Sequence, residues 1–309
     1  MSTLLFMPPQ GFSHDTGEGH PECSERLDVI NSILSTETFH FLIRDDNGPV
    51  TREQLERAHD SDYIDHILSF DGCSRPVELD EDTVISAGTI QAALYGAGAA
   101  CKAVDNVMTG SARNAFCAIR PPGHHAEASK GMGFCLFNNA AIAALQARIV
   151  HNATRVAIID FDVHHGNGIQ SIFWNDEYLL FVSMHEEGGF PQSGLVSETG
   201  ACNNIANVVL HEGAGSEQIQ QAWMDEAETR LRHFAPELVI ICAGFDGHQR
   251  DRMGGLNYTT QDYAWLSEKI VKIANDCCKG RVVSLLEGGY DLPSLAAAAG
   301  VHVKVLMEV

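Results

Sequence analysis

The segment Asp160-Phe161-Asp162-Val163-His164-His165-Gly166-Asn167-Gly168 decides how the rest of the chain is interpreted. It follows an apolar, β-branched run at residues 155–159 that is typical of a buried strand. Carboxylates and an imidazole then occupy alternate positions, at Asp160, Asp162 and His164. Because an unpaired buried charge is strongly unfavourable, this strand end needs a counter-charge. Two Asp and one His suit zinc or another first-row metal and leave a coordination position open; the alternative is a solvated turn.

Around this segment, the chain alternates short apolar runs with stretches of helical spacing. Candidate strands lie at residues 3–7, 115–119, 155–160, 178–184, 205–210, 238–243 and 281–286. Helices are predicted at residues 22–34, 86–108, 138–150, 216–233, 260–277 and 293–305, with two short helical pieces between 52 and 70. This alternation predicts an α/β fold, an open and mostly parallel sheet with helices on both faces. No linker or repeat divides residues 1–309, so we expect a single domain.

Composition narrows the classes of partner. With 45% apolar and 20% charged residues, the chain has the balance of an ordinary globular enzyme. Its formal charge of −21 argues against direct binding to nucleic acid and weakly favours a cationic substrate. No apolar run reaches the length of a membrane span, about 18 residues, and no basic region precedes the short apolar run at the N-terminus. Nine cysteines without a CxxC pair fit reduced thiols, so a cytoplasmic location is expected.

Polar residues follow four of the predicted strands at the point where each strand ends. They occupy residues 120–125, 160–167, 244–248 and 287–291. In open α/β sheets, ligands bind beyond the carboxyl ends of the strands. We therefore expect these four segments to build one site.

The predicted metal ligands are Asp162, His164 and Asp246, with Asp246 arriving from a separate strand. A metal with an open coordination position lowers the pKa of bound water and polarises a carbonyl group. Such a water needs a proton acceptor, and His124 and His125 are the candidates.

The two adjacent histidines are expected to differ in protonation, because each needs its own partner for its second ring nitrogen. Asp160 and Asn167 are the candidate partners. A carboxylate raises the pKa of a histidine more than an amide does, so the pair can divide acid and base duties. Tyr290, behind two glycines, is a candidate hydroxyl donor to a developing oxyanion.

Each of these residues also has an ordinary structural explanation. An isolated histidine pair is more often a loop feature, and a tyrosine after a strand is usually in the core or at its rim. His165 and His185 are interpreted as packed residues or partners of the ligands, and Arg26 as a surface cation of its helix. Together at one sheet edge, the remaining residues favour catalysis.

Long motifs at these positions resemble the zinc-dependent histone deacetylase family, in particular its class II-like bacterial amidohydrolases. The matching motifs are His14–Gly17 with Gly19–Glu22, Arg120–Asn139, Asp160–Gly168, Ala243–Asp246 and Leu286–Leu292. The resemblance extends over nearly the whole chain. It implies an arginase/deacetylase fold and hydrolysis of an acyl-amide to an amine and a carboxylate.

The resemblance also implies a role for each matching residue. Zinc is implied at Asp162, His164 and Asp246, and the same ligand set allows iron(II). His125 is implied as general base and acid, His124 with Asp160 as an electrostatic pair, and Tyr290 as the group that polarises the carbonyl. The implied substrate-binding residues are Gly133, Phe134, Phe190, Met253 and Gly289. A structural potassium ion is implied at main-chain oxygens near Asp160, Asp162 and His164, with Ser183 and Met184.

Three details refine this match. Asn167 stands where class I relatives carry Asp, which fits the class II-like branch. Met253 occupies the position where polyamine-specific relatives have Glu, which points away from a dedicated polyamine enzyme. The loop at residues 184–194 departs from the family's usual loop through its acidic pair, Glu186 and Glu187. We hypothesise that this pair favours a cationic substrate.

The expected activity is metal-dependent removal of an acetyl or other short acyl group from acetyl-lysine or a similar N-acyl amine, in a peptide or a small molecule. The alternative in this class is acetylpolyamine hydrolysis. A two-metal ureohydrolase would want a further Asp where Gly166 stands. A non-catalytic acyl-lysine or metal-binding module would tolerate loss of the residues around the ligands, yet all are present. Neither nucleic acid nor a membrane is an expected partner, and a homo-oligomer is compatible with the sequence.

Overall fold

A computed structural model describes residues 2–308, and its central feature is one sheet of eight strands in the order β2-β1-β5-β10-β9-β6-β7-β8. All neighbouring strands of this sheet are parallel. The strands are β1 Thr3–Phe6, β2 Ile43–Asp45, β5 Asn114–Cys117, β6 Val156–Asp160, β7 Leu179–Glu186, β8 Ile205–Leu210, β9 Leu238–Ala243 and β10 Val282–Leu286. A separate antiparallel pair is formed by β3 Val77–Glu78 and β4 Val84–Ile85.

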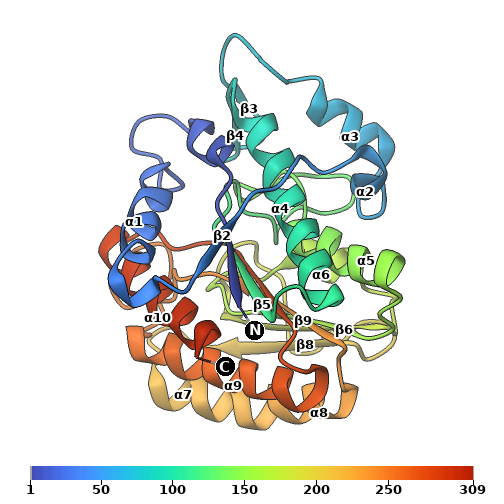
Figure 1. Cartoon of the computed structure of the whole chain (residues 1–309), viewed down its shortest axis with the longest axis vertical. Coiled ribbons are helices and arrows are strands. Elements are labelled where there is room, and N and C mark those ends of the chain that lie inside the picture. Colours follow the sequence, from blue (N-terminus) through green and yellow to red (C-terminus); the bar gives the residue numbers. More distant parts are fainter. Residues whose placement is uncertain (1, 309) are drawn as a thin grey trace.

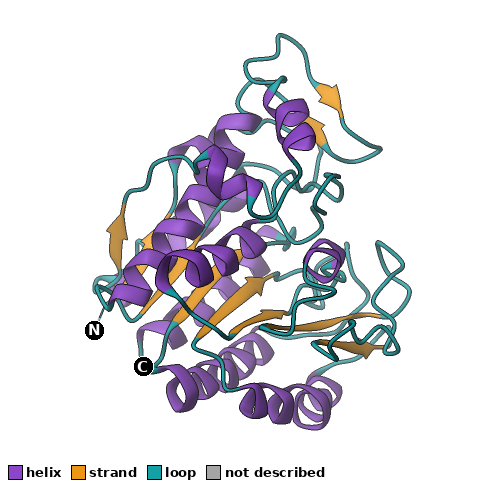
Figure 2. Cartoon of the chain, turned by 90° about the vertical axis from the view of Figure 1, so that its right-hand side faces the viewer, coloured by secondary structure: helices purple, strands orange, loops and turns teal. Residues whose placement is uncertain are grey.

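Helices cover both faces of the sheet (Figures 1 and 2). One buried apolar cluster joins the sheet to α1 Glu25–Leu34, α7 Ser216–Ala222, α8 Glu228–Phe234, α9 Thr260–Cys278 and α10 Leu292–Met307. The other joins it to α2 Arg52–Glu56, α3 Ser61–Leu68, α4 Thr89–Thr109, α5 Asn139–His151 and α6 Asn167–Ile172. The predicted α/β class, with a parallel sheet between two helical layers, is confirmed.

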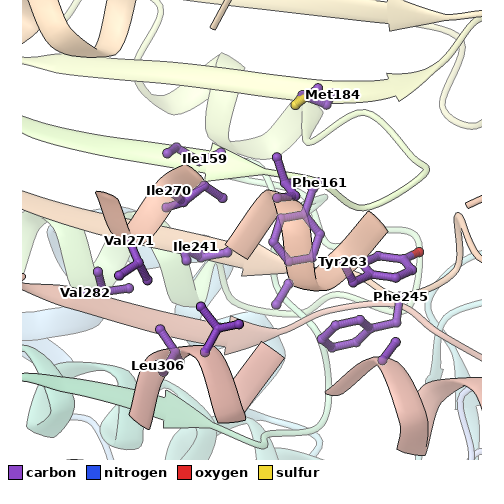
Figure 3. Close-up of a cluster of buried hydrophobic side chains, with 14 of the residues drawn as sticks. Ile159, Phe161, Met184, Ile241, Phe245, Tyr263, Ile270, Val271, Val282 and Leu306 are labelled. Atoms are coloured by element: carbon purple, nitrogen blue, oxygen red, sulfur yellow. The ribbon is translucent and has the colours of Figure 1, made fainter. Parts of the chain in front are cut away.

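Side chains alternate where β6 leaves the sheet, and this alternation anchors the site. Phe161 and Val163 are buried in the apolar cluster, whereas Asp160 and Asp162 turn the other way. The Phe161 ring packs edge-to-face with Phe245, the residue before Asp246, at a centroid distance of 6.0 Å (Figure 3). Edge-to-face aromatic packing of this kind adds to the free energy of burial. The core therefore fixes both strand ends that carry polar groups.

Several elements differ from their predicted form. The edge strand β2 and the short helix α6 were not predicted, because β2 is a three-residue exposed segment and α6 begins inside the polar motif. The helix predicted at residues 216–233 is divided by a π-helical turn, Trp223–Ala227. Two 3₁₀ turns, Pro9–Ser13 and Glu37–Phe39, flank the first helix.

The structure also tests the expectations about membrane spans and cysteines. No helix within residues 2–308 is long and apolar enough to cross a bilayer. All nine cysteines are free thiols, and five of them are buried. The five buried cysteines are small core residues, whereas Cys202 is exposed.

Candidate metal centre and catalytic site

Strand register brings the polar segments together at one edge of the sheet. Asp160 at the end of β6 pairs with Cys242 of β9 and with Ser183 of β7. Leu286 at the end of β10 pairs with Ala243 of β9. The segments that follow β5, β6, β9 and β10 therefore emerge side by side, as the sequence predicted.

Three of these residues form the candidate metal centre. Asp162, His164 and Asp246 each offer one ligand atom, and these atoms lie within 4.8 Å of one another. The His164 Nδ1 lies 2.9 Å from Asp162 Oδ1 and 3.2 Å from Asp246 Oδ2. Asp246 Oδ2 is buried and has no hydrogen-bond partner among the described residues. A Cβ on Gly288 would overlap this oxygen, so glycine is required where β10 passes the ligands.

Electrostatics support a cation at this position. Burial and the neighbouring Asp162 charge raise the pKa of Asp246 to about 6. Burial alone would lower the pKa of His164, but its contacts with Asp162 and Asp246 raise it well above the usual value. Both shifts have one cause: two buried carboxylates converge on a point where positive charge is favourable. The donor set of two oxygens and one nitrogen fits a divalent first-row metal.

The two adjacent histidines have different partners, as predicted. His124 Nδ1 lies 2.9 Å from Asp160 Oδ2, and His125 Nδ1 lies 2.8 Å from Asn167 Oδ1. Burial would lower the pKa of His124, but the charges of Asp160 and Asp162 raise it to about 10. Burial, together with the neighbouring positive charges of His124 and His164, holds the pKa of His125 well below its usual value. At neutral pH His124 is thus protonated and His125 is neutral.

A narrow cavity of about 110 Å³ leads to these groups. Its lining residues are Asp82, Pro122, His124, His125, Gly133, Phe134, His164, Phe190, Met253, Gly288 and Tyr290. The predicted tunnel residues Gly133, Phe134, Phe190 and Met253 all lie on this wall. Gly289 does not: its carbonyl instead accepts a hydrogen bond from Arg26 Nε at 2.7 Å, and Gly288 takes its place on the wall.

The aromatic side chains of the cavity wall lie close to His125 and Tyr290. The Phe190 ring packs edge-to-face on His125 at 5.0 Å, and Phe134 packs in the same way on Tyr290 at 6.0 Å. Gly133 has φ +57°, and a Cβ there would lie 2.6 Å from His125 Cδ2. Only glycine allows the wall to approach the imidazole this closely.

Sequence reasoning missed a buried cluster behind Tyr290. Arg26, expected at the surface, is fully buried. One guanidinium nitrogen lies 2.9 Å from Glu22 Oε1, and the other two donate hydrogen bonds to main-chain carbonyls in the loop that follows β10. Arg120 is also buried and donates to both oxygens of Glu22. Asp251 was missed as well; it accepts hydrogen bonds from the backbone N–H groups of Tyr290 and Asp291. The available signals were the spacing of Glu22 and Arg26, one helical turn, and the presence of Glu22 and Arg120 in the matching motifs.

The other polar residues singled out from the sequence lie outside the group of Asp162, His164 and Asp246. His165 and His185 are buried, with ring centroids 4.7 Å apart, and burial lowers the pKa of His185 to about 4, so both are packed as expected. Ser183 is buried beside them, its hydroxyl 2.9 Å from His185 Nδ1. Glu186 accepts a hydrogen bond from Gly255 N, and Glu187 contacts His211. Neither acidic side chain lies on the cavity wall, which removes the basis of the cationic-substrate hypothesis.

Comparison with known proteins identifies the family. The histone deacetylase domain matches residues 20–306. The chain is 33% identical to Histone deacetylase 14, chloroplastic, of Arabidopsis thaliana, over 98% of this chain and 76% of that protein. It is 32% identical to a probable deacetylase of Archaeoglobus fulgidus, over 100% and 89% of the two chains. The chain therefore belongs to the histone deacetylase family.

Two further matches differ in how much of the other protein is covered. Type-2 histone deacetylase 2 of Dictyostelium discoideum is 39% identical over 246 residues, which are 74% of this chain but 14% of that protein. The crystal structure of the HDA15 HD domain superposes with a TM-score of 0.94 at 32% identity, covering 100% of this chain and 89% of that one. Family membership indicates an enzyme of the deacetylase type, an amidohydrolase.

Proposed function

We propose that the chain is a zinc-dependent hydrolase that removes an acetyl group from acetyl-lysine or a similar N-acyl amine. The observation that carries this proposal is the convergence of Asp162, His164 and Asp246, with one carboxylate oxygen left without a hydrogen bond, next to a narrow cavity that His164 lines. A bound zinc ion would be held by these three residues and would supply a Lewis acid for the amide carbonyl and for water. The same ligands suit iron(II).

The other side chains then have separate duties. His125, neutral and with its Nδ1 engaged by Asn167, presents Nε2 to take a proton from the attacking water. His124, kept protonated by Asp160, contributes a fixed positive charge beside the reacting carbon. Burial raises the pKa of Tyr290 well above its usual value, so its hydroxyl stays protonated and can donate to the carbonyl oxygen. The amine leaves with the proton that His125 returns.

The shape of the cavity supports a short, linear acyl group. Its walls are the aromatic rings of Phe134 and Phe190, which suit an alkyl chain such as that of lysine. Met253 at the rim is apolar and 39% exposed, so no carboxylate stands at that position to select a polyamine. Asp82 also lines the cavity, and together with the formal charge of −21 it favours the alternative, acetylpolyamine hydrolysis.

Further parts of the proposal concern ions, partners and location. A potassium ion would be held by main-chain oxygens near Asp160, Asp162 and His164 with Ser183 and Met184, since Ser183 pairs with Asp160 in the sheet. The proposed substrates are an acyl-lysine peptide or a small amide, without nucleic acid or membrane, and a homo-oligomer remains a prediction. We keep the cytoplasm as the proposed location, although two relatives are named chloroplastic.

The test is release of free amine from a small panel by the purified chain and its Tyr290→Phe variant. The panel holds acetyl-lysine peptide, trifluoroacetyl-lysine peptide and N-acetylated polyamines, each with and without chelator. We expect chelator-sensitive turnover that falls about 10²-fold in the variant, the scale of losing one oxyanion donor. The preferred member names the substrate class. No turnover on any member by metal-loaded protein would contradict the proposal and favour a binding module.

A further inference from the structure

The Asn167 side chain has a different partner on each end of its amide. Its Oδ1 lies 2.8 Å from His125 Nδ1, and its Nδ2 donates to Glu127 Oε1 at 3.0 Å. Two weaker acceptors also face Nδ2, the His125 carbonyl at 3.4 Å and Met132 Sδ at 3.5 Å. Only acceptors therefore surround Nδ2, and the one carboxylate among them is Glu127.

The orientation of this amide decides which nitrogen of His125 carries the proton. With Oδ1 towards the ring, His125 must donate from Nδ1, and its Nε2 keeps a free lone pair. If the amide rotated by half a turn, the NH₂ group would face Nδ1, and the proton would move to Nε2. A histidine in that state could not accept a proton from water at Nε2. An ionised carboxylate accepts but does not donate, so Glu127 favours the first orientation.

Glu127 is held in place but lies outside the cavity that leads to the metal ligands. Its backbone N–H donates to the Lys130 carbonyl at 2.8 Å, and its own carbonyl lies 3.0 Å from His59 Nδ1. Its side chain lines a second cavity of about 500 Å³, together with Lys130, Met132 and Asn167. The two cavities share no lining residue among those described. Glu127 therefore acts without touching the substrate.

We propose that Glu127 is a positioning residue that orients the Asn167 amide and, through it, fixes the tautomer of His125. The inference rests on the proposed function only for its effect on turnover, since the tautomer itself is a property of the resting protein. It assigns a reason for an amide at position 167: a carboxylate there would face Glu127 directly.

The kinetic test uses acetyl-lysine peptide and five variants. Glu127→Ala and Glu127→Lys should lower kcat by about tenfold or more, the scale of a lost charge-assisted hydrogen bond, with KM unchanged. Glu127→Gln should keep most activity, because its amide oxygen still accepts from Asn167.

Asn167→Asp should lose activity as pH rises, since one of two adjacent carboxyls must hold a proton. Glu127→Gln combined with Asn167→Asp should remove that loss, because Gln donates to Asp.

A second readout does not depend on turnover. Nitrogen-15 NMR of histidine-labelled protein should place the His125 proton on Nδ1 in the wild type and shift it towards Nε2 in Glu127→Lys. Asp105→Ala is the matched control, because Asp105 accepts from the Gln146 amide in the same way, away from His125. An unchanged His125 tautomer in Glu127→Lys, or independent effects of Glu127→Gln and Asn167→Asp, would overturn the inference. A shifted tautomer in a protein without turnover would support it and count against the proposed function alone.

Discussion

Two buried clusters of charge lie near the cavity, one behind Tyr290 and one that includes His164, and they are built in opposite ways. In the arginine cluster, Glu22 is shared by Arg26 and Arg120, and the other guanidinium nitrogens donate to carbonyl oxygens. In the metal cluster, Asp162 and Asp246 share the His164 imidazole, and Asp246 Oδ2 has this ion-pair contact but no hydrogen bond among the described residues. The first cluster is complete from protein atoms alone. The second is short of positive charge.

This difference separates structural charge from functional charge. Buried ion pairs are tolerated when further hydrogen bonds satisfy every donor and acceptor, as in the arginine cluster. A buried carboxylate without such partners is costly, and it persists where a ligand supplies what is missing. The same contrast predicts opposite responses to loss of one acidic group in each cluster.

The largest effect is expected for Asp246→Asn in the metal cluster. The change keeps the volume but removes one anionic ligand, so the variant should bind zinc weakly and lose about 10³-fold or more in activity, since Lewis-acid stabilisation is worth several kcal/mol. In metal-free protein, the variant should be more stable than the wild type, because repulsion between Asp162 and Asp246 is relieved. Urea unfolding after chelation measures this. A less stable metal-free variant would contradict the contrast.

Glu22→Gln in the arginine cluster should act in the opposite sense on stability. It leaves two buried guanidinium groups without a counter-charge, which should cost about 3–5 kcal/mol of unfolding free energy. Glu53→Gln is the matched control, because Glu53 and Arg57 are also one helical turn apart but Glu53 is 82% exposed. Its unfolding midpoint should stay within error. Equal effects of the two variants would show that burial does not distinguish the pairs.

A buried histidine without neighbouring carboxylates extends the comparison, because its pKa should be lowered, whereas the pKa values of His124 and His164 are raised. His302 lies between the hydroxyls of Ser267 and Ser284, and burial lowers its pKa to about 3. Between about pH 6.5 and pH 3, His302 is therefore protonated in the unfolded state but neutral in the folded state. Acidification through this range lowers the free energy of unfolding. His302→Gln should reduce the slope of stability against pH by about 1.4 kcal/mol per unit. An unchanged slope from pH 6 to 4 would contradict the burial of a neutral ring.

The smallest effect is expected at the acidic pair where β7 ends. Glu186 and Glu187 are engaged by Gly255 and His211 rather than by the cavity. Substitution of both by Gln should change the ratio of kcat/KM for cationic and neutral acetamides by less than about twofold, as expected for charges that lie outside the cavity and are partly screened by solvent. A selective loss on the cationic substrate would restore the hypothesis drawn from the sequence.

The sequence predicted the metal cluster because its signal is local. Polar residues at alternate positions after an apolar run cannot be explained by a buried strand alone, and Asp246 follows a second such run. The arginine cluster gave no comparable signal, because Glu22, Arg26 and Arg120 meet only through tertiary packing. A Glu–Arg pair one turn apart in sequence is usually a solvated helix face, and burial of Arg26 depends on the loop after β10. Edge strand β2 was missed for a similar reason, since an exposed edge lacks an apolar pattern.

The most direct test of the account is to strip the protein of metal, add zinc back in steps, and follow acetate release from acetyl-lysine peptide. We expect loss of activity on stripping and full recovery at about one equivalent of zinc per chain, with no recovery in Asp246→Asn. Undiminished activity in the stripped protein, or recovery only at two equivalents, would contradict a single metal held by Asp162, His164 and Asp246.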